Sequence, residues 1–249
     1  MRSVMQDYLV FRLHGPMASW GQAAVGGDRH SGQQPTRSAV IGLLSAALGI
    51  TRDDSAQLGL LGQQVRIAVK QYTAGSLLRD YHTAQMPSQK KGAVWATRKS
   101  ELQAEKLNTV LSNRDYRCDG LWVVAVSLVG DGPFKLEQLQ LALLKPTFLL
   151  YLGRKSCPLA APLQPNVLKA HDLKHALDTV FLPMLADASE QYWLEVGGTV
   201  TYFWEGELSS FPAVKRGVFT TRPWDDPVDR KRWQFAQREL HQITLQESI

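Results

Sequence analysis

The chain has 249 residues, of which 44% are hydrophobic and only 20% are charged, so it can bury a substantial core, and neither a disordered chain nor a small disulfide-stapled scaffold is expected. Its net charge of +5 is uneven, because residues 81–118 carry seven basic and three acidic side chains whereas residues 119–249 carry 13 and 15. The surplus predicts that a polyanion meets the N-terminal half, although charge alone fits an ordinary solvated surface equally well.

Strand and helix patterns alternate in the first part of the chain. Residues 8–13 are rich in aromatic and β-branched side chains and stop at a His-Gly-Pro turn, which predicts a first strand. Residues 35–49 have apolar side chains at helical spacing and end in Gly49, a typical helix stop. Residues 65–72 alternate apolar and polar side chains, which predicts a second strand with one face in water.

A long polar insertion, residues 74–119, then precedes further regular elements. Its tip could form one short helix near residues 101–106. Residues 121–129 predict a third strand, residues 136–144 have helical spacing that ends before Pro146, and residues 148–151 predict a fourth strand. The order β-α-β-β-α-β is the split arrangement of ferredoxin-like, RRM-like α+β folds.

Two domains are expected from this pattern. Residues 1–160 would form the ferredoxin-like domain, with the long insertion at about 78–116. Residues 161–249 have a less regular pattern, with extended stretches at 194–205 and 234–245, and predict a smaller C-terminal β-rich lobe.

The insertion mixes cations with aromatic side chains, a composition that suits single-stranded nucleic acid because cations neutralise phosphates and aromatic faces stack on unpaired bases. The side chains concerned are Arg79, Tyr81, His82, Lys90, Lys91, Trp95, Arg98, Lys99, Arg114, Tyr116 and Arg117. An equally good interpretation is a solvated loop with Tyr81 and Tyr116 packed at its base. His82 is the histidine best placed for RNA chemistry, but the sequence shows no partner for it.

The loop 152–158 offers backbone donors, two cations and a hydroxyl, which together could cradle a phosphate. It lacks the Walker spacing, and residues 21–27 lack a dinucleotide-binding fingerprint, so a nucleotide-hydrolysing enzyme finds no support. Asp53 and Asp54 are interpreted as a turn or helix cap. The two cysteines lack metal-ligand spacing, and neither a metal nor a cofactor is expected.

The cellular location is predicted from the lack of a signal-peptide core and of a membrane-spanning run. The stretch 8–13 is interrupted by Arg12 and lacks the continuous apolar core of a signal peptide. The longest apolar run, residues 39–50, is shorter than the roughly 20 residues that cross a bilayer. A reduced, cytoplasmic protein without a membrane partner is therefore expected.

Four ordered blocks of the sequence form a recognisable pattern. They are His14-Gly15-Pro16-Met17 with Trp20-Gly21-Gln22; Pro35-Thr36-Arg37-Ser38 with Gly42-Leu43-Leu44, Leu48-Gly49-Ile50 and Arg52-Asp53-Asp54; Leu78-Arg79-Asp80-Tyr81-His82-Thr83; and Leu144-Lys145-Pro146 with Tyr151-Leu152-Gly153-Arg154-Lys155-Ser156-Cys157-Pro158-Leu159. Together the blocks closely resemble the CasD family of the type I-E CRISPR surveillance complex Cascade. The resemblance is dense from Tyr8 to about Leu163 and thin beyond, with a weaker echo around Arg232 and Phe235.

The resemblance implies a non-catalytic subunit that grips the eight-nucleotide 5′ handle of the CRISPR RNA. It implies a thumb at the basic insertion, contacts with the backbone subunit CasC and the large subunit CasA, and target DNA approached only through the assembled complex. Carried over by position, the RNA-binding set is Trp20, Gln22, Arg37, Ser38, Arg79, Tyr81, His82, Arg114, Tyr116, Gly153, Arg154, Lys155 and Ser156. Trp20 and Tyr151 fit equally well as core aromatics.

A second function stays open, because some relatives of the family cut precursor RNA themselves. A metal-independent endoribonuclease would need a general base at the 2′-hydroxyl and an acid at the leaving oxygen. Tyr81, His82 and Lys90 or Lys91 are the available groups.

Overall fold

The computed structural model describes residues 5–22, 24, 26–88, 92, 94–184, 198–212, 217–229, 232 and 234–246. A seven-stranded sheet in which every neighbouring pair is antiparallel forms the body of the protein. In sheet order its strands are β10 (Phe219–Thr221), β13 (Leu240–Gln246), β9 (Thr199–Trp204), β4 (Val65–Thr73), β7 (Leu121–Leu128), β1 (Gln6–His14) and β8 (Asn166–Ala170).

Helices cover both faces of this sheet. On one face, α1 (Arg37–Leu48), α2 (Ser55–Gln64) and α4 (Leu136–Leu144) contribute to one apolar cluster, and on the other α5 (Leu173–Leu177) contributes to a second. Strand β1 supplies alternate side chains to each, with Phe11 in the first cluster and Val10 in the second. The central strands are therefore buried on both faces. Within the described ranges, no helix has the length and apolar character needed to cross a membrane.

The first three predicted strands and both predicted helices are confirmed as β1, β4, β7, α1 and α4. Helix α1 begins where the Thr36 hydroxyl accepts a hydrogen bond from the Ala39 amide, and it ends at Gly49, whose φ of 78° lies in the left-handed region. Asp54 is the N-cap of α2, as the cap interpretation predicted, and accepts from the Gln57 amide at 3.0 Å.

The expectation that β4 keeps one face in water is wrong. Lys70 on that face is only 2% exposed, and its Nζ lies 2.6 Å from Asp178 Oδ1 and 4.5 Å from the centre of the Tyr72 ring. Helix α5, from the C-terminal part, packs on this face, while β9 pairs with β4 beside it in the sheet. The alternating pattern of β4 correctly marks Lys70 as polar. It cannot show that a helix more than 100 residues later in the chain packs over this face.

The prediction of a fourth strand at residues 148–151 is also wrong. The amides of Thr147 and Phe148 donate to the carbonyls of Ala47 and Ala46 at 3.0 and 3.1 Å, so the segment satisfies the open carbonyls at the end of α1. Leu149 is 81% exposed, and only Tyr151 forms an isolated bridge, with Pro158. The strand beside β1 is instead β8.

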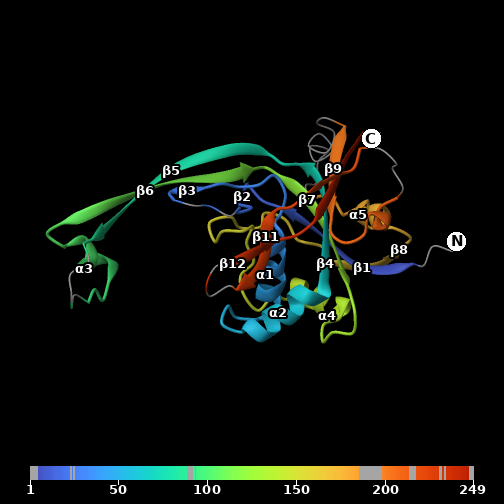
Figure 1. Cartoon of the computed structure of the whole chain (residues 1–249), viewed down its shortest axis with the longest axis horizontal. Coiled ribbons are helices and arrows are strands. Elements are labelled where there is room, and N and C mark those ends of the chain that lie inside the picture. Colours follow the sequence, from blue (N-terminus) through green and yellow to red (C-terminus); the bar gives the residue numbers. More distant parts are fainter. Residues whose placement is uncertain are drawn as a thin grey trace.

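The basic insertion is a long two-stranded hairpin, β5 (Ser76–Pro87) and β6 (Leu107–Cys118), that projects from the body (Figure 1). The short helix α3 (Arg98–Leu102) lies at its far end. Near its base, β6 also pairs with β2 (Met17–Ala18) and β3 (Asp28–Arg29). The sequence missed these strands because most of their residues are exposed, so no face carries an apolar pattern.

The C-terminal part is β-rich but joins the same sheet. Strands β8, β9, β10 and β13 all belong to the seven-stranded sheet, so no break between sheets occurs near residue 160. One hairpin stands apart, β11 (Trp224–Asp229) and β12 (Gln234–Gln237), and β11 contacts α1 and α2. A 3-10 turn, η1 (Leu208–Ser210), completes the described elements.

Candidate nucleic-acid interface

A groove of about 750 Å³ lies between the start of α1, the loop 149–154 and the β11–β12 hairpin. Its lining combines cations, aromatic rings and small polar groups. The lining residues used below are Gln22, Arg29, Ser38, Arg52, Leu149, Tyr151, Gly153, Arg154, Trp224, Asp225 and Phe235. The groove thus brings together four of the predicted RNA-binding residues, namely Gln22, Ser38, Gly153 and Arg154.

The glycine at position 153 is required by a close backbone approach. Its φ is +84°, and a Cβ at this position would lie 1.8 Å from the Ser19 carbonyl oxygen. The Ser19 amide in turn donates to the Leu152 carbonyl at 2.9 Å. Gly153 therefore holds the loop against the segment that follows β1, which places the next residue, Arg154, at the groove.

Arg154 lies where three segments meet. Its guanidinium is 4.8 Å from the centre of the Tyr116 ring, and its terminal nitrogens donate at 3.3 Å to the carbonyls of Asp115 and Arg29. The stacking and the two hydrogen bonds hold an arginine, itself only partly buried, at the base of the hairpin. Lys155 and Ser156 are exposed beside it but do not line the groove.

A buried carboxylate organises the hairpin base. Asp115 has a side chain only 5% exposed and accepts from Arg79 Nε at 2.7 Å, Arg79 Nη2 at 3.0 Å and His30 Nδ1 at 3.0 Å. The hydrogen bonds from Arg79, which outweigh the opposing effect of burial, lower the pKa of Asp115 to about 2. Arg79, predicted to bind RNA, thus has a protein partner, although its side chain is 53% exposed.

Arg37 does not face the groove, contrary to its predicted role as a phosphate ligand. It is 6% exposed and lies between Glu205 Oε2 at 2.5 Å and Asp226 Oδ1 at 2.8 Å. Its backbone amide donates to Asp225 Oδ2 at 2.9 Å. Carboxylates from the C-terminal part therefore occupy the backbone amide and the guanidinium of Arg37. This guanidinium is not free to bind a phosphate.

Trp20 and Tyr116, both predicted RNA contacts, are core residues. Trp20 is 1% exposed and packs edge-on against Trp122 with ring centroids 5.1 Å apart. Tyr116 is 6% exposed beneath Arg154. Neither ring has a face free to stack on a base, so Trp20 follows the alternative interpretation as a core aromatic.

The hairpin surface carries the other predicted residues. Tyr81 is 59% exposed, and Arg114 is half-buried in the strand register opposite Asp80. His82 Nε2 lies 2.5 Å from Asp80 Oδ2. These residues stand apart from the groove, since none of them lines it. Lys90 and Lys91 lie outside the described residues.

The sequence of the protein matches a known family over most of its length. The family model described as CRISPR-associated protein (Cas_Cas5) matches residues 8–241. The chain is also 38% identical over 181 residues to the "CRISPR system Cascade subunit CasD" of Escherichia coli (strain K12), a match that covers 70% of this chain and 76% of that protein. The chain belongs to the CasD family. This confirms the resemblance, including its type I-E assignment.

Two solved structures resemble the CasD-family fold described above. A chain of a "CRISPR RNA-guided surveillance complex" has a TM-score of 0.62 at 24% identity, with 96% of this chain and 90% of that chain covered. A "Crystal structure of Cas protein" has a TM-score of 0.57 at 25% identity, with coverage of 96% and 95%. The mixed α/β architecture with its large antiparallel sheet is thus one that solved Cas proteins share.

Sequence reasoning missed several groove residues of this CasD-family protein. Arg29 lies on the two-residue strand β3, and Trp224 lies on β11, in a stretch with no clear pattern. Arg52 lies within a motif block and Phe235 within the weaker echo, but neither was singled out as a site residue. The signal that could have found them was the motif itself, because both lie inside stretches that resemble the family.

Acid should weaken the hairpin base, because the pKa of Asp115 is lowered from 3.8 to about 2. A depressed carboxylate pKa contributes stability above the unfolded value, and this is lost as pH falls from 3.8 towards 2. Urea unfolding should therefore show wild type clearly more stable than Asp115→Asn at pH 6, with the gap shrinking between pH 4 and pH 2. The exposed variant Asp131→Asn is the control, and a gap for Asp115→Asn that stays constant with pH would contradict the assignment.

Proposed function

We propose that the protein is a non-catalytic RNA-binding subunit of a type I-E CRISPR Cascade complex, and that its groove grips the 5′ handle of the CRISPR RNA. The observation that carries the proposal is the lining of that groove by three arginines, Arg29, Arg52 and Arg154, beside exposed Trp224 and partly buried Tyr151 and Phe235. Asp225 is the only carboxylate in this lining, and it is already held by Arg238 at 2.7 and 2.9 Å.

The composition of the groove suits a single strand whose bases are unpaired. Arginines neutralise phosphates and release counterions, which makes binding strong at low salt. Aromatic faces stack on bases at about 1–3 kcal/mol each, with little dependence on sequence. Leu149 at 81% exposure and Trp224 at 56% exposure add apolar surface that a base would cover.

The ferredoxin-like assignment is part of the same proposal. The strand order β4–β7–β1–β8, with α1 between β1 and β4 and α4 between β7 and β8 in the chain, is the order that the split β-α-β-β-α-β arrangement produces. Strand β8 takes the place expected for residues 148–151. An RRM-like module with an inserted hairpin is consistent with RNA binding.

The proposed partners follow from the relatives. One relative bears the name of a Cascade subunit, and one solved relative is a chain of an RNA-guided surveillance complex. We infer that the projecting hairpin acts as a thumb against CasC and the guide, that CasA contacts the body, that target DNA is approached through the complex, and that the assembly is cytoplasmic. Exposed Leu77, Val110 and Leu111 on the hairpin give it apolar surface for such contacts.

Substituting Arg154 tests the groove. In a titration of Arg154→Gln with single-stranded RNA carrying the repeat's 5′ handle, affinity should fall, and the slope of log K against log salt should flatten by about one unit, since one phosphate contact is lost. The control is Lys169→Gln, because Lys169 is exposed on β8 and does not line the groove. An Arg154→Gln slope equal to wild type would remove Arg154 from the RNA surface.

The same samples test the alternative function of a metal-independent endoribonuclease. The observation that favours it is that His82 Nε2 lies 2.5 Å from Asp80 Oδ2, which places a carboxylate beside an imidazole, although the two form no hydrogen bond in this structure. Repeat RNA incubated with the protein in a chelator should stay intact on a denaturing gel. A specific cut that is lost in His82→Ala would overturn the non-catalytic proposal.

A further inference from the structure

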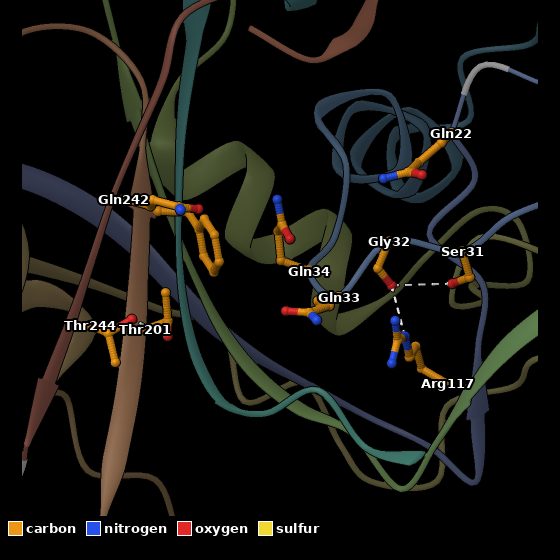
Figure 2. Close-up of a pocket in the computed structure, with 10 residues that line it drawn as sticks. Gln22, Ser31, Gly32, Gln33, Gln34, Arg117, Thr201, Gln242 and Thr244 are labelled. Carbon is orange, nitrogen blue, oxygen red and sulfur yellow. Dashed lines mark hydrogen bonds between the residues drawn. The ribbon is translucent and has the colours of Figure 1, made fainter. Parts of the chain in front are cut away.

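A second cavity, of about 420 Å³, lies between Gln22 and the loop 31–34 on one side and the strands β9 and β13 on the other (Figure 2). Its volume falls within the range of pockets that bind small molecules and cofactors. Side-chain amides, hydroxyls and one guanidinium dominate its lining, which comprises Gln22, Ser31, Gly32, Gln33, Gln34, Arg117, Thr201, Phe203, Gln242 and Thr244. No carboxylate is among these lining residues, so the pocket has a positive charge from Arg117.

The glutamine amides of the pocket are uncommitted, whereas its hydroxyls are not: Thr201 and Thr244 bond to each other at 2.9 Å, and Ser31 Oγ accepts from the Trp20 amide. None of its four glutamine side chains has a hydrogen-bond partner among the residues that the structure describes. In the view of Figure 2, Gln34 lies between Gln22 and Gln242. Arg117 donates from Nε to the Gly32 carbonyl at 3.2 Å, which leaves its terminal nitrogens for another acceptor. An amide offers a donor and an acceptor together, the combination that reads the edge of a nucleobase.

The wall of the pocket is held in place by backbone contacts. The Trp20 amide donates to Ser31 Oγ at 2.9 Å, and the Gly32 amide donates to the Trp20 carbonyl at 2.8 Å. The Trp122 indole donates to the Gln33 carbonyl at 2.9 Å. The loop is thus anchored to two core tryptophans, so the amides are displayed from a fixed frame, which lowers the entropy cost of binding.

Gln22 connects this pocket to the groove, because it lines both. A strand held in the groove by Arg29 and Arg154 would therefore pass the mouth of the pocket. We propose that the pocket takes one unpaired base of the bound RNA, with the base edge on the glutamine amides and an adjacent phosphate on Arg117. This inference rests on the proposed RNA binding. It adds a site that distinguishes one base from another, whereas the groove binds phosphates and stacks on bases with little dependence on sequence.

A scan of synthetic handle RNAs tests the pocket. Each of the eight positions is made abasic in turn, and affinity for the full-length protein is measured. Wild type should lose about tenfold at one position, the value of one good amide-to-base pair. In Gln34→Met and Gln242→Met, which keep side-chain length but remove the amide, that penalty should shrink several-fold while the other positions stay unchanged. Arg117→Gln should weaken all RNAs alike.

Gln246→Met is the matched control, because Gln246 lies on β13 two residues beyond Thr244, is exposed and does not line the pocket. Two results would overturn the base pocket while leaving RNA binding intact. In the first, no abasic position lowers the affinity of wild type; in the second, the sensitive position causes the same loss of affinity in both methionine variants. If wild type binds none of the RNAs, the proposed function itself fails and the pocket has no RNA ligand.

Discussion

Replacing Arg37 with methionine should lower the free energy of unfolding by about 3–5 kcal/mol, the usual cost of removing one partner from a buried ion pair. Glu205 Oε2 lies 2.5 Å from the guanidinium, so the variant would keep a buried carboxylate that has lost its nearest cation, with Arg238 Nη1 3.5 Å from its other oxygen and a weaker attraction from Arg66. The carbonyl of Gly62 would also lose its Arg37 donor, and that of Val65 would lose one of two, since Arg66 Nη1 still donates to it at 3.1 Å. Urea unfolding followed by circular dichroism measures the difference.

The control for this prediction is an arginine in an exposed pair. Arg222 is 68% exposed and lies 3.1 Å from Glu239, which is 60% exposed, so Arg222→Met should cost less than about 1 kcal/mol. If Arg37→Met does not fold, Arg37→Lys keeps the charge and should show an intermediate loss, because an ammonium cannot reach all the acceptors of the planar guanidinium. Equal costs for Arg37→Met and Arg222→Met would contradict the buried network.

RNA binding gives a second readout of the same residue. Since the guanidinium of Arg37 points into the network and does not line the groove, folded Arg37→Lys should keep the wild-type salt dependence of RNA binding. A flatter slope would restore Arg37 to the phosphate-binding set that the sequence predicted.

Replacing Gly153 with alanine should destabilise the fold by about 2–4 kcal/mol, from strain at a positive φ together with loss of a neighbouring hydrogen bond. The new Cβ would lie 1.8 Å from the Ser19 carbonyl oxygen, so loop 153–158 must move away from the segment after β1. Because Arg154 follows directly, RNA affinity should fall with stability. Urea unfolding and RNA titration of one preparation measure both effects.

Gly130 supplies the matched control for Gly153. Its φ of +65° is also left-handed, but no atom lies within 4 Å of the position of a Cβ. Gly130→Ala should therefore show only the conformational cost, about 1–2 kcal/mol, and leave RNA affinity unchanged. Similar losses in the two variants would show that the close approach to Ser19 contributes nothing.

The elements that the sequence predicted well are those with a strong local signal. Strand β1 is rich in aromatic and β-branched residues, α1 has a capping threonine and a terminal glycine, and α4 has helical spacing before a proline. Residues 148–151 have the same apolar signal as a strand, yet Phe148 bonds to the end of α1 and Tyr151 forms only an isolated bridge with Pro158. Local pattern shows that a segment is apolar, but which backbone it pairs with depends on the rest of the chain.

By itself, the sequence determined the family, the central elements and the presence of a basic insertion, because motif blocks, apolar periodicity and charge are all local properties of the chain. Only the tertiary structure decided which arginines lie at the groove and which are buried in ion pairs. Arg37 and Arg154 have the same charge, but Arg37 meets carboxylates 168 and 189 residues away, whereas Arg154 stacks on Tyr116 at the edge of the groove. A side chain's availability depends on partners that folding brings from distant segments.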